Sequence, residues 1–466
     1  MNLLNTIINT TNDILWGNVL IILLVVLGIY FTWQTGFVQF TYLKEMFALL
    51  GDGIGKNAAT HKGISSFQAF CISTASRVGT GNIAGVAIAI VMGGPGAVFW
   101  MWLMALLGAA SGFIESTLAQ IYKVKEGDSY RGGPAYYMEK GLGKRWLGIV
   151  FSGLITVTFG LIFNAVQANT ITAAFNNAFN INKVLMGLII SIITAIVIFG
   201  GVKRIAKVSE VLVPFFAVAY ILVALVVIIL NIKQLPGIIV LIFENAFGLK
   251  QVAVGGIMGT ILYGVKRGLF SNEAGMGSAP NAAATATVSH PVKQGLIQCL
   301  GVFVDTIIIC SCTAFIILLA GDYTNTSLTG IELTQAALTS QFGAFGKYFI
   351  AICIVLFAFS SIVGNYYYGQ ANIEFIKANK IFITLYRICV VAMVMFGSLV
   401  EVALVWNLAD VFMGFMAIIN LIAITLLCRI AVLCLKDYRA QKAAGIKDPV
   451  FKSSSIKGLK NTTEWE

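Results

Sequence analysis

The sequence predicts an all-α polytopic membrane protein, and three observations lead to that fold class. Of its 466 residues, 58% are hydrophobic and only 11% are charged, and the mean hydropathy is +0.88. A soluble domain of this length needs many more charged residues to cover its surface. Apolar runs of at least about 18 residues, enough to cross a bilayer core, recur along the chain. In two of these runs, closely spaced glycines interrupt the apolar pattern.

The apolar runs predict about eleven transmembrane helices. No basic stretch precedes the first run, so we expect it to remain as a span rather than to be a cleaved signal. The spans form one transmembrane domain, residues 1–435, followed by a basic tail, residues 436–466. The predicted spans lie near residues 15–33, 65–92, 96–122, 148–176, 182–200, 208–230, 251–282, 293–320, 345–374, 381–400 and 404–435.

Lysine and arginine gather in alternate loops and in the tail, and this bias orients the chain. If the N-terminus is outside, the outside loops hold only Lys183, Lys233, Lys250 and Lys347. Positive residues favour the cytoplasmic side. We therefore predict a multi-pass protein of the cell (inner) membrane with the N-terminus outside and the tail in the cytoplasm. The net charge of +11 then reflects this bias and attraction to membrane lipid, and no nucleic-acid partner is expected.

The chain lacks the sequence signatures of an enzyme. His61 and His290 are its only histidines, and neither belongs to an HExxH zinc motif. No GxxxxGK[ST] phosphate loop occurs. The eight cysteines fall in or beside apolar spans, which favours buried small side chains over disulfides or metal ligands. We expect no enzymatic activity and no organic cofactor.

Glycines interrupt the second predicted span in the stretch TASRVGTGNIAGVA, residues 74–87. Each interior glycine costs a helix about 1 kcal/mol relative to alanine, so Gly79 and Gly81 around Thr80 favour a break. Backbone groups freed inside hydrocarbon are costly unless a partner satisfies them. A substrate carboxylate can accept hydrogen bonds from freed amides, and a cation can bind freed carbonyls. The alternative is that these glycines only let neighbouring helices pack closely.

A second interrupted span, residues 255–282, reads GGIMGTILYGVKRGLFSNEAGMGSAPNA and comes five spans after the first. With the first span set aside, spans 2–6 (about 65–230) and 7–11 (about 251–435) form two sets of five, with spans 2 and 7 broken. Because five is odd, the second set must cross the membrane with inverted topology. Broken helices at matching places in two inverted halves indicate a transporter's binding site.

Four motifs carry a family resemblance. They are GTGNIAGVA (79–87), GGPGAVFWMWLMALLG (93–108), RGGPAYY (131–137) and RGLFSNEAGMGSAP (267–280). From about Trp16 to about Asn420 the chain resembles the alanine or glycine:cation symporter family, in its bacterial alanine/glutamine-type branch. The resemblance implies a LeuT-like fold and an alternating-access symporter with one chain as the transport unit. Sodium, or less often a proton, would drive uptake of a small neutral amino acid such as alanine, glycine or glutamine.

The resemblance also implies roles for residues at the first break. The backbone of Gly79, Thr80 and Gly81, with Asn82 beside it, would bind the substrate carboxylate. The carbonyls of Ala75 and Val78 and the hydroxyls of Ser360 and Ser361, in FAFSSIVGNYYYG of the ninth span, would bind sodium. The alternative for the two serines is hydrogen bonding between helices.

Further substrate contacts are expected from three other spans. Gln167 matches a family position that lines the substrate site, although a lone glutamine can also serve helix packing. Gly259 and Thr260 are expected to face the substrate amine. Many relatives carry tryptophan where this chain has Asn365, and threonine where it has Ser361. An amide in place of an indole leaves more room, so we expect a substrate larger than glycine, with glutamine a candidate beside alanine.

Arg77 and Glu273 are expected to act in coupling or gating. A charge at mid-membrane costs at least about 2.5 kcal/mol, so Arg77 should face the interior and have a partner. A structural ion pair is one interpretation; the other is that its guanidinium lies near a second cation site and lowers the number of coupled ions. Two other functions also remain open, an amino-acid-gated ion channel and a membrane amino-acid sensor. The candidate partners of Arg77 are Glu115, Glu210, Glu273, Asp305, Glu374 and Asp410.

Overall fold

A computed structural model of the chain describes residues 2–52, 63–127, 129–200, 202–248, 256–321, 323 and 327–465, with 202–213 described as backbone alone. The Glu210 side chain and Gly255, both named above, lie outside these parts. The described chain is helical apart from irregular connections and one antiparallel strand pair, β1 (Val124–Glu126) with β2 (Ser129–Arg131). The predicted all-α class is confirmed.

The first half of the chain runs through the first broken helix and ends on a sharp bend after α12. α12 and α13 meet at 103°, and the sequence had not predicted α13 as a separate helix. The helices of this half are α1 (Asn2–Ile14), η1 (Leu15–Leu20), α2 (Ile21–Gln34), α3 (Val38–Thr41), α4 (Leu43–Asp52), α5 (Ser66–Arg77), η3 (Gly81–Gly85), α6 (Val86–Gly93), α7 (Ala97–Ile121), α8 (Pro134–Lys140), α9 (Arg145–Val157), η4 (Thr158–Phe163), α10 (Asn164–Phe179), α11 (Lys183–Ile198), α12 (Val202–Leu230) and α13 (Leu235–Ala246).

The second half repeats this plan with its own broken helix at the start, made of α14 and α15. One further helix, α18, lies between the counterparts of the third and fourth spans. The elements of this half are α14 (Gly256–Asn272), α15 (Ala279–Ala283), α16 (Pro291–Val302), η5 (Phe303–Cys310), α17 (Ser311–Ala320), α18 (Gly330–Phe342), α19 (Ala344–Ile376), α20 (Lys380–Leu399), α21 (Val402–Ala443) and η7 (Ser453–Ser455).

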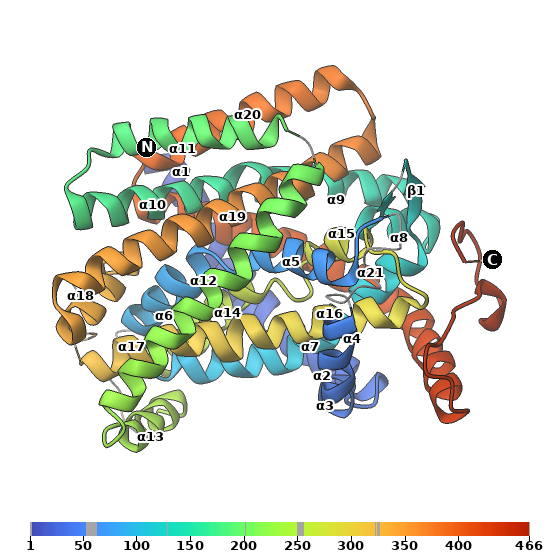
Figure 1. Cartoon of the computed structure of the whole chain (residues 1–466), viewed down its shortest axis with the longest axis horizontal. Helices are drawn as coiled ribbons and strands as arrows, with labels where there is room; N and C mark the ends of the chain where they lie inside the picture. The colour runs from blue at the N-terminus through green and yellow to red at the C-terminus, as the bar shows by residue number, and fades with distance from the viewer. Residues whose placement is uncertain are drawn as a thin grey trace.

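Counterpart helices of the two predicted repeats pack against each other. α7 packs against α16, α10 against α19, and α11 against α20. Several long helices run along the longest axis of the molecule, α12 crosses them obliquely, and α5, α14 and α15 lie among them rather than at the edge (Figure 1). The residues of both breaks are buried.

Seven described helices are long and apolar enough to cross a membrane, or up to nine if each of two bent pairs counts as one span. One bent pair is Ser66–Arg77 with Gly81–Gly93, the predicted second span. α11, with 16 residues, is apolar but shorter than that limit. A multi-pass membrane protein is confirmed, whereas the count of eleven spans stays a prediction.

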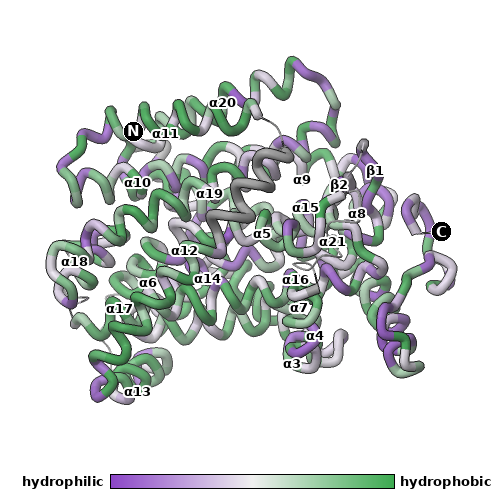
Figure 2. Tube along the Cα trace, viewed as in Figure 1, coloured by the Kyte–Doolittle hydropathy of each residue, from purple (hydrophilic) through white to green (hydrophobic). Residues whose placement is uncertain are grey.

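The C-terminal tail packs against the body of the protein. α21 continues to Ala443, past the predicted end of the last span at residue 435. Hydrophilic residues are prominent beyond it and in β1 (Figure 2). The tail nevertheless buries Trp465, whose Nε1 donates to the Gln120 carbonyl at 2.8 Å, and Phe451, whose amide donates to the Ser289 carbonyl.

Candidate functional site

The first break lies between α5 and η3, where the chain bends by 50°. A capping box starts α5, because Ser65 accepts from the Gln68 amide and the Gln68 side chain accepts from the Ser65 amide. The helix ends after Arg77, since Val78 adopts an extended backbone with ψ of 94°. η3 then begins at Gly81 as a π-helical turn, a feature frequent at functional sites. The predicted break is therefore present at the predicted glycines.

Side chains take over the backbone amides that the break frees. In an unbroken helix the amides of Gly79 and Thr80 would donate to the carbonyls of Ala75 and Ser76. Instead, the Gly79 amide donates to Asn82 Oδ1 and the Thr80 amide to Gln167 Oε1, each at 2.9 Å. Asn82 and Gln167 thus lie where the sequence predicted them, and the carbonyls of Ala75 and Ser76 are released from the helix.

Close approach by three other elements explains why glycine occupies positions 79 and 81. A Cβ at Gly79 would lie 2.3 Å from Ser361 Oγ and 2.8 Å from Gln167 Oε1. A Cβ at Gly81 would lie 2.9 Å from the Phe270 ring and 3.3 Å from the Ser271 Cα. The scaffold helices α10 and α19 and the second broken helix therefore all meet the backbone of the first break.

Oxygen atoms suited to an alkali cation lie between α5 and α19. Ser361 Oγ lies 3.3 Å from the Val78 carbonyl oxygen and 3.0 Å from that of Phe357, and Ser360 Oγ donates to the Phe357 carbonyl at 2.8 Å. The Asn82 amide, which would donate to Val78 in a helix, donates to Gly79 instead. Freed carbonyls and hydroxyls are the ligands that Na⁺ takes at broken helices. The residues present fit sodium.

The second break, Glu273–Ser278, has its backbone satisfied from within the protein. Gly275 and Gly277 have φ of 85° and 83°, a conformation that favours glycine. The buried carboxylate of Glu115 on α7 accepts from the amides of Gly275 (3.2 Å) and Gly277 (3.1 Å). Asn420 Nδ2 donates both to Glu115 Oε2 (2.8 Å) and to the Gly275 carbonyl (2.9 Å). The sequence suggested Glu115 only as a partner of Arg77.

Asn82 joins the first break to the second broken helix and to η5. Its Nδ2 donates to Asp305 Oδ1 at 2.6 Å and to Ser271 Oγ at 3.0 Å. Asp305 Oδ2 in turn accepts from Ser271 at 2.6 Å and from Thr306 at 2.9 Å. These side chains hold three interrupted elements in one arrangement, so Asn82 has a structural role at this site.

A second polar cluster joins the two broken helices to α19. Ser76 Oγ lies 2.9 Å from Glu273 Oε1 and 2.7 Å from Asn365 Oδ1, and Ser278 Oγ donates to Glu273 Oε2 at 2.5 Å. Glu273 has φ of 57°, which is uncommon for a residue with a side chain. The structure therefore brings Asn365 and Glu273 together, through a serine that the sequence had not indicated.

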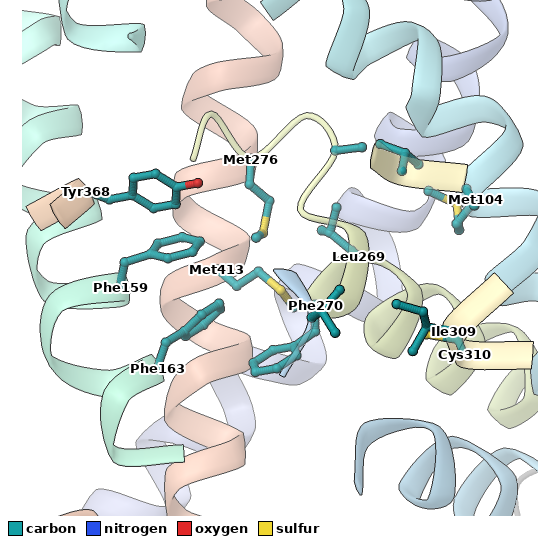
Figure 3. Close-up of a cluster of buried hydrophobic side chains, with 14 of the residues drawn as sticks. Met104, Phe159, Phe163, Leu269, Phe270, Met276, Ile309, Cys310, Tyr368 and Met413 are labelled. Carbon is teal, nitrogen blue, oxygen red and sulfur yellow. The ribbon is translucent and has the colours of Figure 1, made fainter. Parts of the chain in front are cut away.

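Aromatic side chains cover the side of the breaks that faces α10 and α21. Figure 3 shows the rings of Phe159, Phe163, Phe270 and Tyr368, drawn from η4, α14 and α19, in one cluster with Met276 and Met413. The ring centroids of Phe163 and Phe270 lie 4.6 Å apart. Phe270 also stacks toward Trp406 at 4.7 Å. Sequence reasoning missed Phe270, although it lies in the motif RGLFSNEAG just before the second break.

Arg77 is buried, as predicted, but it is not paired as predicted. Its Nη1 donates to the Gln298 carbonyl at 3.4 Å, and its Nε and Nη2 have no hydrogen-bond partner among the described residues. Asp410 pairs with Arg267 and Lys266, and Glu374 pairs with Arg131. An ion pair of Arg77 is therefore wrong for the five candidate carboxylates whose side chains are described.

The charge of Arg77 still acts over a longer range. Glu115, Glu273 and Asp305 all lie close enough for it to influence them electrostatically. These three carboxyl groups converge on the region between the two breaks, from α7, the second break and η5. Arg77 is therefore a shared counter-charge for several carboxyl groups instead of the partner of one.

Gly259 and Thr260 do not join the other candidate residues. Thr260 Oγ1 donates to the Gly93 carbonyl at 2.7 Å, at the far end of α6. At 1.5 Å per residue, Thr260 is about 18 Å along α14 from the break that follows Asn272. The residues of α14 that reach the first break are Phe270 and Ser271.

Comparisons with known proteins cover nearly the whole chain. The model of the "Sodium:alanine symporter family" matches residues 1–453. The amino-acid carrier protein AlsT of Bacillus subtilis is 57% identical over 99% of this chain and 98% of its own length. The probable sodium/glutamine symporter GlnT of the same organism is 56% identical over 99% and 96%. The sodium/alanine symporter AgcS of Methanococcus maripaludis is 40% identical over 92% and 95%.

Solved structures share the fold at low sequence identity. A manganese transporter of Eremococcus coleocola aligns with a TM-score of 0.54 at 14% identity, covering 83% of this chain and 81% of that one. MhsT, solved with L-phenylalanine, aligns with a TM-score of 0.50 at 16% identity, covering 80% and 98%. Both are transporters of the LeuT-like fold, so the predicted fold is confirmed.

Proposed function

Because the chain belongs to the sodium:alanine symporter family and is a sodium-coupled amino-acid symporter, we propose that it binds its substrate at the first break. The substrate is a small neutral amino acid, and alanine and glutamine are the first candidates. Uptake proceeds by alternating access around this site, with one chain as the transport unit. No enzymatic step and no organic cofactor take part.

One observation carries the proposed site: buried polar groups at the first break lack partners that a substrate would supply. Thr80 Oγ1, Asn365 Nδ2 and Tyr368 Oη are buried and have no hydrogen-bond partner among the described residues. Buried polar atoms left in this state cost about 1–3 kcal/mol each. A bound amino acid offers both donors and acceptors, and so removes this cost.

The backbone of the break fits the two charged ends of an amino acid. Gln167 Oε1 accepts from the Thr80 amide, as a substrate carboxylate oxygen would. We propose that the carboxylate binds at Gly79, Thr80 and Gly81 and displaces Gln167, which then contacts the substrate. The ammonium group fits the carbonyl oxygen of Ser76, which the break releases. The positive end of the η3 and α6 dipole favours the carboxylate at this position.

Sodium would bind beside the substrate, at the carbonyls of Ala75 and Val78 and the hydroxyls of Ser360 and Ser361. The 3.3 Å separation of Ser361 Oγ from the Val78 carbonyl oxygen supports this proposal. A cation there would join α5 to α19, so binding of sodium would order the same break that receives the substrate. A proton remains the alternative coupling ion, with Glu273 as its carrier.

The proposed orientation follows the distribution of positive charge. The N-terminus lies outside, the tail lies in the cytoplasm, and the protein resides in the cell (inner) membrane in contact with anionic lipid. The described tail carries Lys447, Lys452, Lys457 and Lys460, which supports this orientation.

Asn365 sets the size of substrate in this proposal. Its amide is buried at the site and leaves more room than an indole would. Replacement Asn365→Trp is therefore expected to reduce glutamine uptake at least about tenfold while alanine uptake falls much less, since one overpacked site costs roughly 1–3 kcal/mol. Glutamine uptake that survives this replacement would contradict the size argument.

Uptake into proteoliposomes containing the purified chain tests the function. Labelled alanine and glutamine are offered with an inward sodium gradient, with a proton gradient alone, and with neither. Accumulation that requires sodium and saturates is the expected result. Ion current without saturable uptake would indicate a channel, and binding without accumulation would indicate a sensor. Accumulation with protons alone would contradict the sodium site.

A further inference from the structure

Ser76 connects a residue of the proposed substrate site to a carboxyl group at the other break. It lies 2.7 Å from Asn365 Oδ1 on α19 and 2.9 Å from Glu273 Oε1 at the second break. All three side chains are buried. The second oxygen of Glu273 accepts from Ser278. The serine is thus the middle member of a hydrogen-bond chain that crosses from one broken helix to the other.

The number of hydrogens in this chain allows two arrangements. A serine hydroxyl has one hydrogen to donate, whereas an ionised carboxylate and an amide oxygen can only accept. If Glu273 is ionised, Ser76 donates to it, and Asn365 must present its amide nitrogen to Ser76. If Glu273 carries a proton, it donates to Ser76, and Ser76 donates to the Asn365 amide oxygen. The proton on Glu273 therefore fixes the direction of the hydrogen bonds from Glu273 through Ser76 to Asn365.

The free end of Asn365 differs between the two arrangements. With its oxygen toward Ser76, the amide nitrogen is left over, and this buried nitrogen has no partner among the described residues. With its nitrogen toward Ser76, the carbonyl oxygen is left over instead. The left-over group is a donor in the first case and an acceptor in the second, and a ligand at the first break would meet it.

We propose that Ser76 is a positioning residue through which the proton on Glu273 decides whether Asn365 offers a donor or an acceptor to the bound amino acid. The inference rests on the proposed substrate site. This arrangement would distinguish substrates by their side chains. The glutamine side chain can form a hydrogen bond with either the nitrogen or the oxygen of the Asn365 amide, with different affinities, whereas the methyl group of alanine can bond to neither.

Other charged and titratable groups face Glu273 and set when it holds a proton. Arg77 on α5 has the opposite charge to an ionised Glu273, Asp305 on η5 has the same charge, and the Tyr368 hydroxyl on α19 faces the same region. Glu115 on α7 accepts a hydrogen bond from the amide of Gly275, two residues after Glu273. All of these groups are buried, so the packing of the two broken helices against their neighbours sets the surroundings of Glu273.

The unmodified protein provides the first test. The KM values of glutamine and alanine are measured in proteoliposomes under a sodium gradient, from about pH 5.5 to about pH 8.5, the range across which a perturbed carboxyl group can titrate. The ratio of the two KM values is expected to change with pH, through glutamine alone. A constant ratio would overturn the inference, whereas absence of sodium-driven uptake at any pH would overturn the proposed function itself.

Two variants assign the effect to Ser76 and Glu273. Ser76→Ala is expected to raise the glutamine KM about tenfold, the effect of one lost buried hydrogen bond, and to make the KM ratio independent of pH. Ser73→Ala is the matched control, because Ser73 is a buried hydroxyl of α5 whose one partner among the described residues is the Phe70 carbonyl. A pH-dependent ratio that persists in Ser76→Ala would overturn the inference.

Asn365→Asp gives a readout that a purely structural serine would not produce. The carboxylates of Glu273 and of the new side chain at position 365 would then both need a hydrogen from Ser76, which has only one to donate. Both hydrogen bonds to Ser76 can therefore form only when one carboxylate gains a proton. Uptake of alanine is expected to rise at least about fivefold as the pH falls through this range. Adding Glu273→Gln supplies a donor in place of the proton and should remove that rise. A rise that persists in the double variant would contradict the proposed chain.

Discussion

The two breaks differ in what satisfies their backbone, although they occupy matching places in the two halves. At the second break, Glu115 and Asn420 satisfy both glycine amides and the Gly275 carbonyl, and both partners are buried parts of the protein. At the first break, the Thr80 amide depends on one glutamine oxygen from another helix, and several polar atoms nearby have no partner. The second break is satisfied by the protein itself, and the first is the one that we propose to be completed by ligands.

This difference indicates a structural role for the second break and agrees with the ligand-binding role that we propose for the first. A break whose amides are held by a buried carboxylate can keep its shape whether or not a ligand is bound. In the proposed mechanism, the first break, whose Thr80 amide is held by Gln167, would change its partners when a carboxylate and a cation bind. The glycine pattern is similar in both, so glycine alone does not tell which break binds a ligand.

Removing the Glu115 carboxylate, which binds the amides of the second break, should lower the stability of the protein more than any other change considered below. Glu115→Ala leaves the buried amides of Gly275 and Gly277 unsatisfied, which costs about 2–6 kcal/mol. We expect a much lower midpoint of thermal unfolding in detergent, whatever the concentration of substrate or sodium. Glu115→Gln keeps one acceptor oxygen and should lose less. Normal thermal stability of Glu115→Ala would show that the second break is not held from within.

Filling the first break should abolish transport with less effect on folding. Gly79→Ala places a methyl group 2.3 Å from Ser361 Oγ, and overpacking of this kind costs about 1–3 kcal/mol, or roughly a hundredfold in uptake at the upper end. Gly153→Ala in α9 is the control, because nothing lies within 4 Å of its added Cβ. Equal uptake by the Gly79 variant and its control would contradict the proposed site.

The two serines at the first break should differ in their effect on sodium. Ser361 approaches the Val78 carbonyl, whereas, within the described parts of the chain, the hydroxyl of Ser360 bonds only to Phe357 of its own helix. We expect Ser361→Ala to raise the sodium concentration for half-maximal uptake about fivefold, and Ser360→Ala to raise it less, since one lost ligand is worth about 1 kcal/mol. The reverse order would show that Ser360 is the main ligand.

The smallest effect on stability concerns Lys123, which lies two residues beyond the end of α7. Its ammonium group lies over the rings of Tyr130 and Trp465, and burial lowers the pKa of Lys123 to about 7. Between that value and the unfolded pKa near 10.4, the unfolded chain holds more protons. Its contribution to stability therefore rises with pH across this window.

Lys123→Met should flatten that rise. The checking measurement is the midpoint of thermal unfolding of the variant and of the unmodified protein, from about pH 7 to about pH 10, because only the difference between them isolates this one group. Parallel curves would mean that the Lys123 ammonium group is not desolvated. This result would leave the comparison of the two breaks untouched, which makes it a control on the rest of the molecule.

Sequence reasoning reached the first break almost residue by residue. Gly79, Thr80, Asn82, Gln167 and Ser361 meet in the structure as the motifs implied. It failed for Gly259 and Thr260, which lie in the same helix, α14, as Phe270 and Ser271 but near its other end, whereas Phe270 and Ser271 contact the first break. Several glycines in a helix predict that it is easily interrupted, but they do not predict at which turn the interruption occurs.

The sequence by itself determined the fold class, the membrane environment, the family and the place of the first break. Hydropathy, charge bias and glycine spacing are local properties, so they can be read from the chain in order. Only the tertiary structure decided the partners: that Glu115 binds the amides of the second break, that Arg77 donates to a carbonyl and pairs with none of the described carboxylates, and that Ser76 joins Asn365 to Glu273. Those contacts join residues 160 to 305 positions apart, for Glu115 with Gly275 and Asn420 among others, and packing alone brings such distant groups together.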